Sequence, residues 1–128
     1  MLVAAARAAG VRDPRVLEAL AAVPRVGYVP RGHWVDAGFD RPIPIGFGQV
    51  TTQPSLVAAM VEALGLRGNE RVLEVGAGLG YQAALLARLV REVWSVERQP
   101  RLAAGAAANL ARAGVEELGR APLHRQGG

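Results

Sequence analysis

The stretch 71–80, read together with Glu97, constrains the fold of this chain more than any other part of the sequence. It begins with residues that are apolar and β-branched enough to predict a buried strand, Arg71–Val75, and three glycines follow at alternate positions. An apolar pattern of helical period starts at once, and a second strand over residues 93–96 leads to Glu97. A strand, a glycine turn, a helix, a strand and a terminal acid predict one half of a nucleotide-binding α/β fold.

The turn and the acid that follows it indicate what kind of ligand would bind there. Glycines permit positive φ and let another molecule approach the backbone, where a Cβ would be in the way. Glu97 would lie at the carboxyl edge of the sheet, where it can accept hydrogen bonds from both hydroxyls of a ribose. Tyr81 stands where the dinucleotide fingerprint has its third glycine, which disfavours a pyrophosphate at this helix N-terminus.

Glu74, at the end of the first strand, narrows the choice of ligand further. A carboxylate there disfavours a phosphate, because it would add a negative charge beside one, and it suits a cationic ligand part. S-adenosylmethionine combines a sulfonium, an ammonium and a ribose. The simpler interpretation of the glycines alone is an ordinary tight strand–helix connection, which the two acids make less favoured. A nicotinamide-dependent oxidoreductase is disfavoured by the G-x-G-x-G spacing and by Glu74.

The composition predicts one small domain without disulfides. The chain has 128 residues, half of them hydrophobic, and no cysteine, so neither a disulfide framework nor a thiolate metal site is expected. The first ten residues lack the basic start and the length of a signal peptide. No apolar run approaches the roughly 20 residues of a membrane span. We therefore expect a cytoplasmic protein without a membrane partner.

All fifteen cationic side chains are arginines, and the isoelectric point is about 10.9. The arginines are scattered rather than clustered and aromatic residues are few, so a solvated surface is favoured over a nucleic-acid-binding patch. His33 and His124 are isolated, without a second ligand at metal spacing. We expect both at the surface, and no metal site.

Helices are predicted on both sides of a long connection. An aspartate N-cap followed by proline predicts a helix over residues 11–22. Residues 23–49 are so rich in Pro and Gly that we expect a structured, functional loop without a regular element, and its Trp34 and Phe39 are expected to pack the loop down. Beyond Gly114 the pattern dissolves and no strand is expected.

The next helix is predicted from Pro54 to Gly65, and a later one covers residues 101–113. The simplest role for the hydroxyls just ahead of Pro54, those of Thr51 and Thr52, is to cap that helix. The buried face predicted for the helix after Pro54 consists of Leu56, Val57, Met60, Val61 and Leu64.

Several segments together resemble the protein-L-isoaspartate O-methyltransferase family, which repairs isomerised aspartate. The glycine motif alone is typical of any class I methyltransferase, whereas the segment from Pro42 to Pro54 is specific to this family. The similarity runs from about Asp13 to about Glu116. The matching segments, in chain order, are Asp13–Leu20 with Val23–Arg25, Pro42–Gly46, Gly48–Pro54, Val72–Gln82 and Ser95–Arg98.

This resemblance implies an α/β, class I S-adenosylmethionine-dependent methyltransferase (Rossmann-like) fold, of which the chain would hold the N-terminal part, with a helical and loop substrate region at its start. It implies methyl transfer to the free carboxylate of L-isoaspartyl residues in damaged proteins. Thr52 would be the catalytic residue that orients this carboxylate, and Glu97 would hold the ribose. The other implied residues are Glu74, Gly76, Ala77, Gly78 and Gly80 for the cofactor, and Ile45, Gly46 and Thr51, again with Thr52, for the substrate.

The sequence departs from the family in two places. Thr52 stands where the family usually has a serine, which keeps the hydroxyl but adds a methyl group. Residues 117–128 match nothing in the family, so we expect a C-terminal truncation, with a substrate region at 1–54, half of a cofactor domain at 55–116 and a divergent tail. A non-catalytic remnant, and a class I methyltransferase acting on RNA or a small molecule, stay open as alternatives. The oligomeric state also stays open.

Overall fold

The parallel sheet predicted around the glycine turn is present in the computed structural model, which describes residues 1–115 and 123–125. Strands β3 (Arg71–Val75) and β4 (Glu92–Glu97) pair in parallel, and β5 (Leu123–Arg125) adds to the other side of β4. The expectation that no strand follows Gly114 is therefore wrong. A strand of three residues that pairs through its backbone needs no apolar alternation, so the sequence carries little signal for it.

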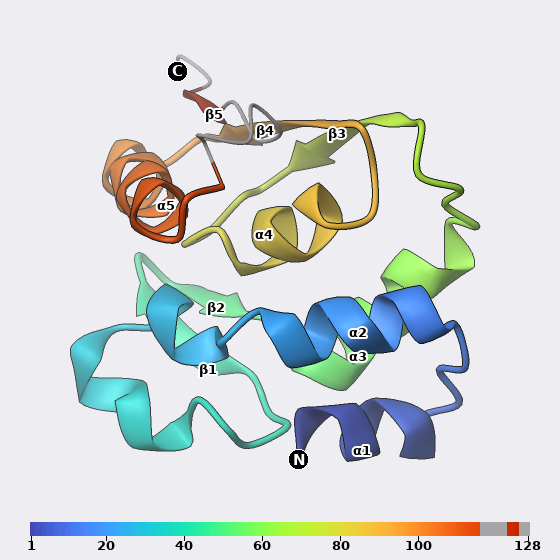
Figure 1. The fold of residues 1–128 in the computed structure, drawn as a ribbon. Coiled ribbons are helices and arrows are strands. Elements are labelled where there is room, and N and C mark those ends of the chain that lie inside the picture. The colour runs from blue at the N-terminus through green and yellow to red at the C-terminus, as the bar shows by residue number, and fades with distance from the viewer. Residues whose placement is uncertain (116–122, 126–128) are drawn as a thin grey trace.

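Two helices cover one face of this sheet (Figure 1). Helix α4 (Tyr81–Ala87) starts directly after the glycine turn, and every residue in it except Gln82 is buried. Helix α5 (Pro100–Arg112) begins where the Gln99 side chain accepts a hydrogen bond from a backbone N–H in its first turn, and both of its leucines are buried. Both predicted helices are confirmed.

A second layer of helices lies against the other side of α4, so that α4 is enclosed (Figure 1). Glu62 fixes the arrangement of this layer, because its carboxylate accepts hydrogen bonds from the backbone N–H groups of Arg12 and Asp13, both at 2.7 Å. This second layer consists of α1 (Leu2–Ala8), which was not predicted, α2 (Pro14–Ala22) and α3 (Pro54–Ala63).

Among the helices of the described residues, none is long and apolar enough to span a membrane.

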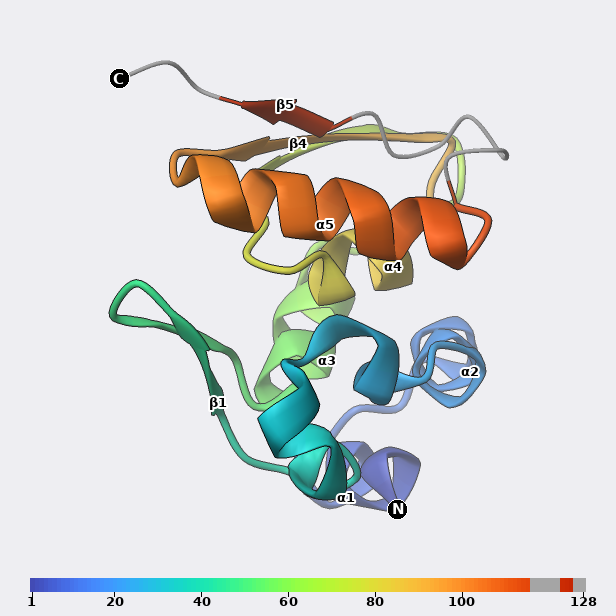
Figure 2. The same ribbon diagram turned by 90° about the vertical axis from the view of Figure 1, so that its left-hand side faces the viewer.

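Residues 23–49 are not the irregular loop that their Pro and Gly content suggested. They form two 3₁₀ helices, η1 (Arg25–Tyr28) and η2 (Arg31–Asp36), and then β1 (Ile43–Gly46), which forms an antiparallel hairpin with β2 (Gln49–Thr51) (Figure 2). A two-stranded hairpin consists only of edge strands, and an edge strand tolerates proline because it leaves one row of N–H groups unpaired. The prolines and glycines here mark short elements and turns.

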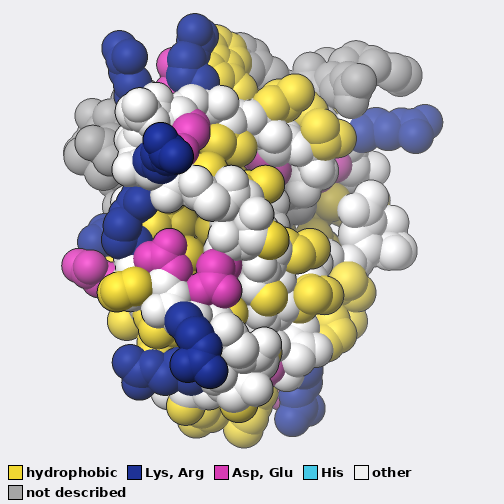
Figure 3. Space-filling view, turned by 90° about the vertical axis from the view of Figure 1, so that its right-hand side faces the viewer, with side chains coloured by type: hydrophobic (Ala, Val, Ile, Leu, Met, Phe, Trp, Pro, Cys, Tyr) yellow, Lys and Arg dark blue, Asp and Glu magenta, His cyan; other side chains and the backbone are white. Residues whose placement is uncertain are grey.

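The buried face of α3 was predicted only in part. Val57 and Val61 are buried, but Leu56, Met60 and Leu64 are 51%, 47% and 59% exposed. The other buried residues of the helix are small, Pro54, Ser55 and Ala58, and the helix packs mainly against α1 and α2. Apolar side chains are accordingly visible at the surface on the side of the molecule that carries the connection from α3 to β3 (Figure 3).

The two aromatic residues expected to pack the loop down are also more exposed than predicted. Trp34 is 49% exposed and Phe39 is 44% exposed. Each ring instead carries a guanidinium over its face, Arg31 at 5.1 Å from the Trp34 centroid and Arg41 at 5.0 Å from that of Phe39. Cation–π contacts of this kind stabilise an aromatic ring at the surface without burying it.

Candidate active site

The glycine turn lies at the carboxyl end of β3 and leads into α4. Gly76, Gly78 and Gly80 all have left-handed backbone conformations, with φ of +86°, +57° and +101°. Gly78 meets a second constraint, because a Cβ at this position would lie 3.2 Å from Cδ1 of Ile45 in the hairpin. The segment predicted to hold the cofactor and the segment predicted to hold the substrate are therefore in contact.

Glu97, the last residue of β4, is buried beside this turn. One carboxylate oxygen accepts a hydrogen bond from the N–H of Gly78 at 2.8 Å, and the other accepts one from the N–H of Gln99 at 2.9 Å. The side chain thereby holds together the glycine turn and the turn that starts α5. Each carboxylate oxygen has a second lone pair, so these contacts leave acceptor capacity for a ligand hydroxyl.

Glu74 lies further inside, on the helix-covered face of β3. Its carboxylate accepts hydrogen bonds from the Ser95 hydroxyl at 2.7 Å and from the Gln82 side-chain amide at 3.1 Å. Burial raises the pKa of Glu74 above its ordinary value; the two hydrogen bonds oppose this shift, and the negative charge of Glu97 adds to it. A buried acid with a raised pKa that lines a cleft is a feature of functional sites.

A cleft of about 70 Å³ lies between the turn and the hairpin. Six of the predicted site residues line it, whereas the other four are not among its lining residues: Ile45, Gly46, Gly80 and Glu97. Larger hollows of about 520, 590 and 430 Å³ lie around α1, α2 and η2, but their linings lack the glycine backbone and the carboxylate pair. The lining consists of Val50, Thr51, Thr52 and Val57 from one side and of Glu74, Gly76, Ala77, Gly78, Leu79, Tyr81 and Gln82 from the other.

The hairpin presents its residues to the cleft in different ways. Thr51 and Thr52 are half-buried at its wall. Ile45 is buried against Gly78, and Gly46 is exposed where the chain begins to turn. The tip continues through Phe47, the one non-glycine residue with positive φ (+57°) in the described part of the chain. Left-handed backbone at a non-glycine residue is uncommon and is frequently found at functional positions.

Asp40 is a residue of this region that the sequence analysis missed. Its carboxylate accepts hydrogen bonds from the N–H of Ser55 at 2.8 Å and from the Gln53 side chain at 3.0 Å, so it caps α3 from a distance. The suggestion that Thr51 and Thr52 cap this helix is wrong, because the N-cap position is Gln53. Burial acts to raise the pKa of Asp40, but the hydrogen bonds and the nearby guanidinium outweigh it, and the pKa lies below its ordinary value.

Arg25 and Tyr81 were also missed. Arg25 is buried in η1 and donates hydrogen bonds to three backbone carbonyls, including that of Thr52. Tyr81 is buried at the start of α4, and burial raises its pKa to about 12, so the hydroxyl stays protonated at neutral pH. An arginine inside an apolar stretch is the one signal that could have drawn attention to Arg25.

The expectations about metal binding can be compared with the described residues only. Within 1–115 and 123–125, no three His, Asp or Glu side chains gather in a way that could hold a metal ion. His33 is partly exposed and lies 3.3 Å from the carboxylate of Asp36. The side chain of His124 lies outside the described part of the structure.

Comparison with known sequences gives consistent similarities. The profile of the protein-L-isoaspartate(D-aspartate) O-methyltransferase family matches residues 1–123, so the similarity begins before Asp13 and reaches beyond Glu116, into the tail that was expected to match nothing in the family. A protein-L-isoaspartate O-methyltransferase of Anaeromyxobacter dehalogenans (strain 2CP-1 / ATCC BAA-258) is 58% identical over 119 residues, which cover 93% of this chain and 55% of the relative. That of Myxococcus xanthus (strain DK1622) is 52% identical over 109 residues, which cover 85% and 51%. The chain spans about half the length of the curated relatives it matches.

Solved structures agree with this result. A structure named protein-L-isoaspartate O-methyltransferase aligns with a TM-score of 0.86 and 28% identity, over 99% of this chain and 41% of its own. A structure from Plasmodium falciparum, solved with S-adenosyl-L-homocysteine, aligns with a TM-score of 0.79 over 98% of this chain and 60% of its own, and at 22% identity this likeness concerns the fold alone. The predicted class, an α/β Rossmann-like methyltransferase fold present in part, is confirmed.

Proposed function

The chain belongs to the protein-L-isoaspartate(D-aspartate) O-methyltransferase family, and from this membership we propose that it transfers a methyl group from S-adenosylmethionine to the free carboxylate of L-isoaspartyl residues in damaged proteins. The partners would be isoaspartyl-containing proteins or peptides, not nucleic acids or membranes, and the reaction would take place in the cytoplasm. The observation that carries the proposal is the contact of Gly78 with both Glu97 and Ile45, which joins the predicted cofactor and substrate segments.

The residues around the turn fit S-adenosylmethionine chemically. Glu97 would accept hydrogen bonds from the ribose hydroxyls, because it lies at the carboxyl edge of the sheet and keeps acceptor capacity. The left-handed turn would let the cofactor pass close to the backbone, and Glu74 would offset positive charge on its methionine part. The turn residues with this role are Gly76, Ala77, Gly78 and Gly80. The cofactor, when bound, supplies an electrophilic methyl group on a sulfonium.

On the substrate side, the chain has little chemistry to perform. A carboxylate is ionised at neutral pH and is already a nucleophile, so no general base is needed. The Thr52 hydroxyl would donate a hydrogen bond that orients it, while Thr51 and the backbone at Ile45 and Gly46 would hold the flanking peptide. Catalysis would then come from alignment of the reacting groups and from exclusion of water.

The size of the cleft adds a requirement to this proposal. Sites for ligands of cofactor size usually measure about 300–1,000 Å³, and the cleft between hairpin and turn measures about 70 Å³. The tip of the hairpin would therefore move away from Gly78 when ligands enter. The three consecutive positive φ angles at Gly46, Phe47 and Gly48 place the sharpest bend of the hairpin at this tip.

A second candidate is a chain that neither binds the cofactor tightly nor transfers methyl groups. The observation that favours it is the exposure of Leu73 and Val75, 64% and 73%, on the face of β3 opposite the helices. Parallel sheets ordinarily have both faces covered. An incompletely covered sheet would hold the glycine turn less firmly.

The decisive experiment measures transfer of labelled methyl from S-adenosylmethionine to an isoaspartyl peptide and to the matching aspartyl peptide, with cofactor binding followed by calorimetry. Transfer to the isoaspartyl peptide alone is the expected result. Thr52→Val, which removes the hydroxyl at nearly constant volume, should lower the rate, and Thr52→Ser should retain it. Absence of both transfer and cofactor binding would reject the proposal in favour of the second candidate.

A further inference from the structure

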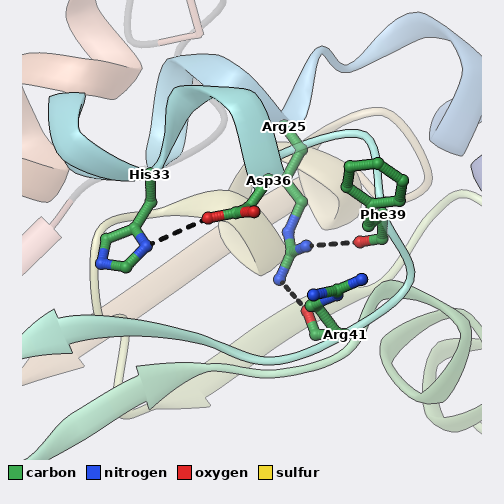
Figure 4. A network of polar contacts seen from close by, with 5 residues as sticks. All are labelled: Arg25, His33, Asp36, Phe39 and Arg41. Carbon is green, nitrogen blue, oxygen red and sulfur yellow. Dashed lines mark hydrogen bonds and ion pairs between the residues drawn. The ribbon is translucent and has the colours of Figure 1, made fainter.

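Arg25 is a buried charge whose partners are unusual (Figure 4). Its side chain is 3% exposed, and its guanidinium donates to the carbonyls of Phe39 at 3.0 Å, Arg41 at 2.7 Å and Thr52 at 3.4 Å. Its Nε is buried and has no hydrogen-bond partner among the described residues. Burying a charge is costly unless it is well satisfied, so an arginine kept here without a carboxylate contact calls for a specific role.

The three carbonyls lie at the two ends of one element. Phe39 and Arg41 precede the hairpin, and Thr52 directly follows it. A planar guanidinium presents its donors in a fixed geometry, so a single side chain can fix both ends of the hairpin at once. Asp40, between the two acceptors, is engaged by the start of α3 through Ser55 and Gln53, and it attracts the guanidinium only through its charge.

The same hairpin is fixed at a second place, near its tip, where Ile45 meets Gly78. Thr52 takes part in the first of these contacts through its carbonyl, and it also lines the cleft. Tyr81, at the start of α4, lines the same cleft. If the tip moves to admit ligands, the Arg25 contacts hold the ends of the hairpin in place meanwhile.

We propose that Arg25 is a positioning residue, whose guanidinium holds both ends of the β1–β2 hairpin and thereby sets the Thr52 hydroxyl against the glycine turn. This inference rests on the proposed function, since it assigns Arg25 a part in that reaction. Arg25 is not among the residues that line the cleft. It acts through the backbone of residues 39–41 and of Thr52.

The test compares Arg25→Gln and Arg25→Lys with Arg15→Gln. Arg15 is a matched control, because it also donates to two backbone carbonyls, those of Leu66 and Leu89, but these lie in the connections just after α3 and α4 and not next to the hairpin. Three quantities are measured for each full-length variant: kcat and KM for the isoaspartyl peptide, affinity for S-adenosylmethionine, and amide hydrogen exchange across residues 39–52.

We expect Arg25→Gln to lower kcat for the peptide by about tenfold to a hundredfold, as small misplacements of reacting groups do. Affinity for S-adenosylmethionine should stay within about twofold, and exchange should accelerate in residues 39–52 while α2 and α4 remain protected. Arg25→Lys should recover part of kcat, because it restores donors. Arg15→Gln should lower global stability without a selective loss of kcat.

Two results would overturn the inference. One is unchanged kcat and unchanged exchange in Arg25→Gln. The other is a parallel loss of kcat, cofactor affinity and protection throughout the chain, which would make Arg25 a general structural residue. If the wild-type chain transfers no methyl group, the proposed function fails, whereas the exchange pattern still decides whether Arg25 holds the hairpin.

Discussion

Toward the carboxyl ends of β3 and β4, the two faces of these strands carry the opposite of the usual distribution of side chains. On the face covered by α4 and α5, Glu74, Ser95 and Glu97 are at most 4% exposed. On the other face, Leu73 and Val75 are 64% and 73% exposed, and no helix of the described residues covers them. Polar groups are therefore buried and apolar groups are exposed on the same two strands.

The covered face carries the residues of the candidate site, whereas the open face carries residues typical of the inside of a sheet. Buried polar groups persist in proteins when they are hydrogen-bonded: Glu74 accepts a hydrogen bond from Ser95 on β4, and Glu97 accepts one from Gly78 in the glycine turn. The open face is of the kind that a parallel sheet normally buries. Its polar contacts, such as the Arg71–Glu92 ion pair at 3.0 Å, lie toward the amino end of the strands, away from the site.

The largest expected effect is that of Glu97→Ala on the covered face. It would leave the N–H groups of Gly78 and Gln99 without their acceptor, and each lost bond to a charged group costs about 1.5–3 kcal/mol, so we expect a loss of about 3 kcal/mol in the free energy of unfolding. Urea unfolding measures this. Arg71→Ala on the open face is the control and should cost less than about 1 kcal/mol, as exposed ion pairs do. Equal losses would remove the contrast between the faces.

Gly78→Ala should have the next largest effect. A left-handed alanine costs about 1–2 kcal/mol, a cost that Gly76→Ala shares. Only at Gly78 would the new Cβ meet Ile45, and crowding should add about 1 kcal/mol. Ile45→Val removes the Cδ1 atom concerned, so in the double variant the extra cost should disappear. If Gly76→Ala and Gly78→Ala are equally destabilised, the hairpin does not rest on the turn.

A smaller effect, with a definite pH dependence, is expected at Glu74. Because its pKa is raised in the folded state, its contribution to stability is fully present below the unfolded pKa and is lost as the pH rises through the folded pKa. Wild type should therefore be more stable relative to Glu74→Gln at pH 4 than at pH 8, with a difference of under about 1 kcal/mol at neutral pH.

Glu74→Leu provides the contrast to this amide variant. It would leave the Ser95 hydroxyl without its acceptor and should cost about 1–3 kcal/mol at every pH. Chemical unfolding across this pH range measures both variants. A wild-type advantage over Glu74→Gln that grows toward pH 8 would contradict the raised pKa.

The covered face could be predicted from the sequence because its signals are local. Strand β3, α4 and β4 each have their own apolar pattern, the glycines mark the turn, and the two acids stand near the carboxyl ends of the strands. The contacts of Arg25 and Asp40 could not be predicted in this way. Their partners are mostly backbone groups 14 to 27 residues away, and a carbonyl or N–H is present whatever residue type supplies it.

Two elements of the N-terminal part, α3 and the hairpin, show the same limit of prediction from sequence. The apolar residues of α3 predicted a helix correctly, but their period alone could not distinguish the side that meets α1 and α4 from the side that stays exposed. The hairpin was missed because Pro42 and Pro44 disfavour strands in general but not edge strands. What the sequence left undetermined in both cases was which neighbour each element would meet.

The smallest effect is expected on the open face. Replacing Leu73 and Val75 together with threonine keeps β-branched or strand-compatible residues in an exposed position, so the free energy of unfolding should change by no more than about 0.5 kcal/mol. Light scattering at high protein concentration should at the same time show less self-association, because exposed apolar patches promote it. A loss of stability well above 1 kcal/mol would mean that this face is covered in solution. In that event Leu73 and Val75 would be exposed only in the isolated chain, and the contrast between the two faces would disappear once the open face is covered.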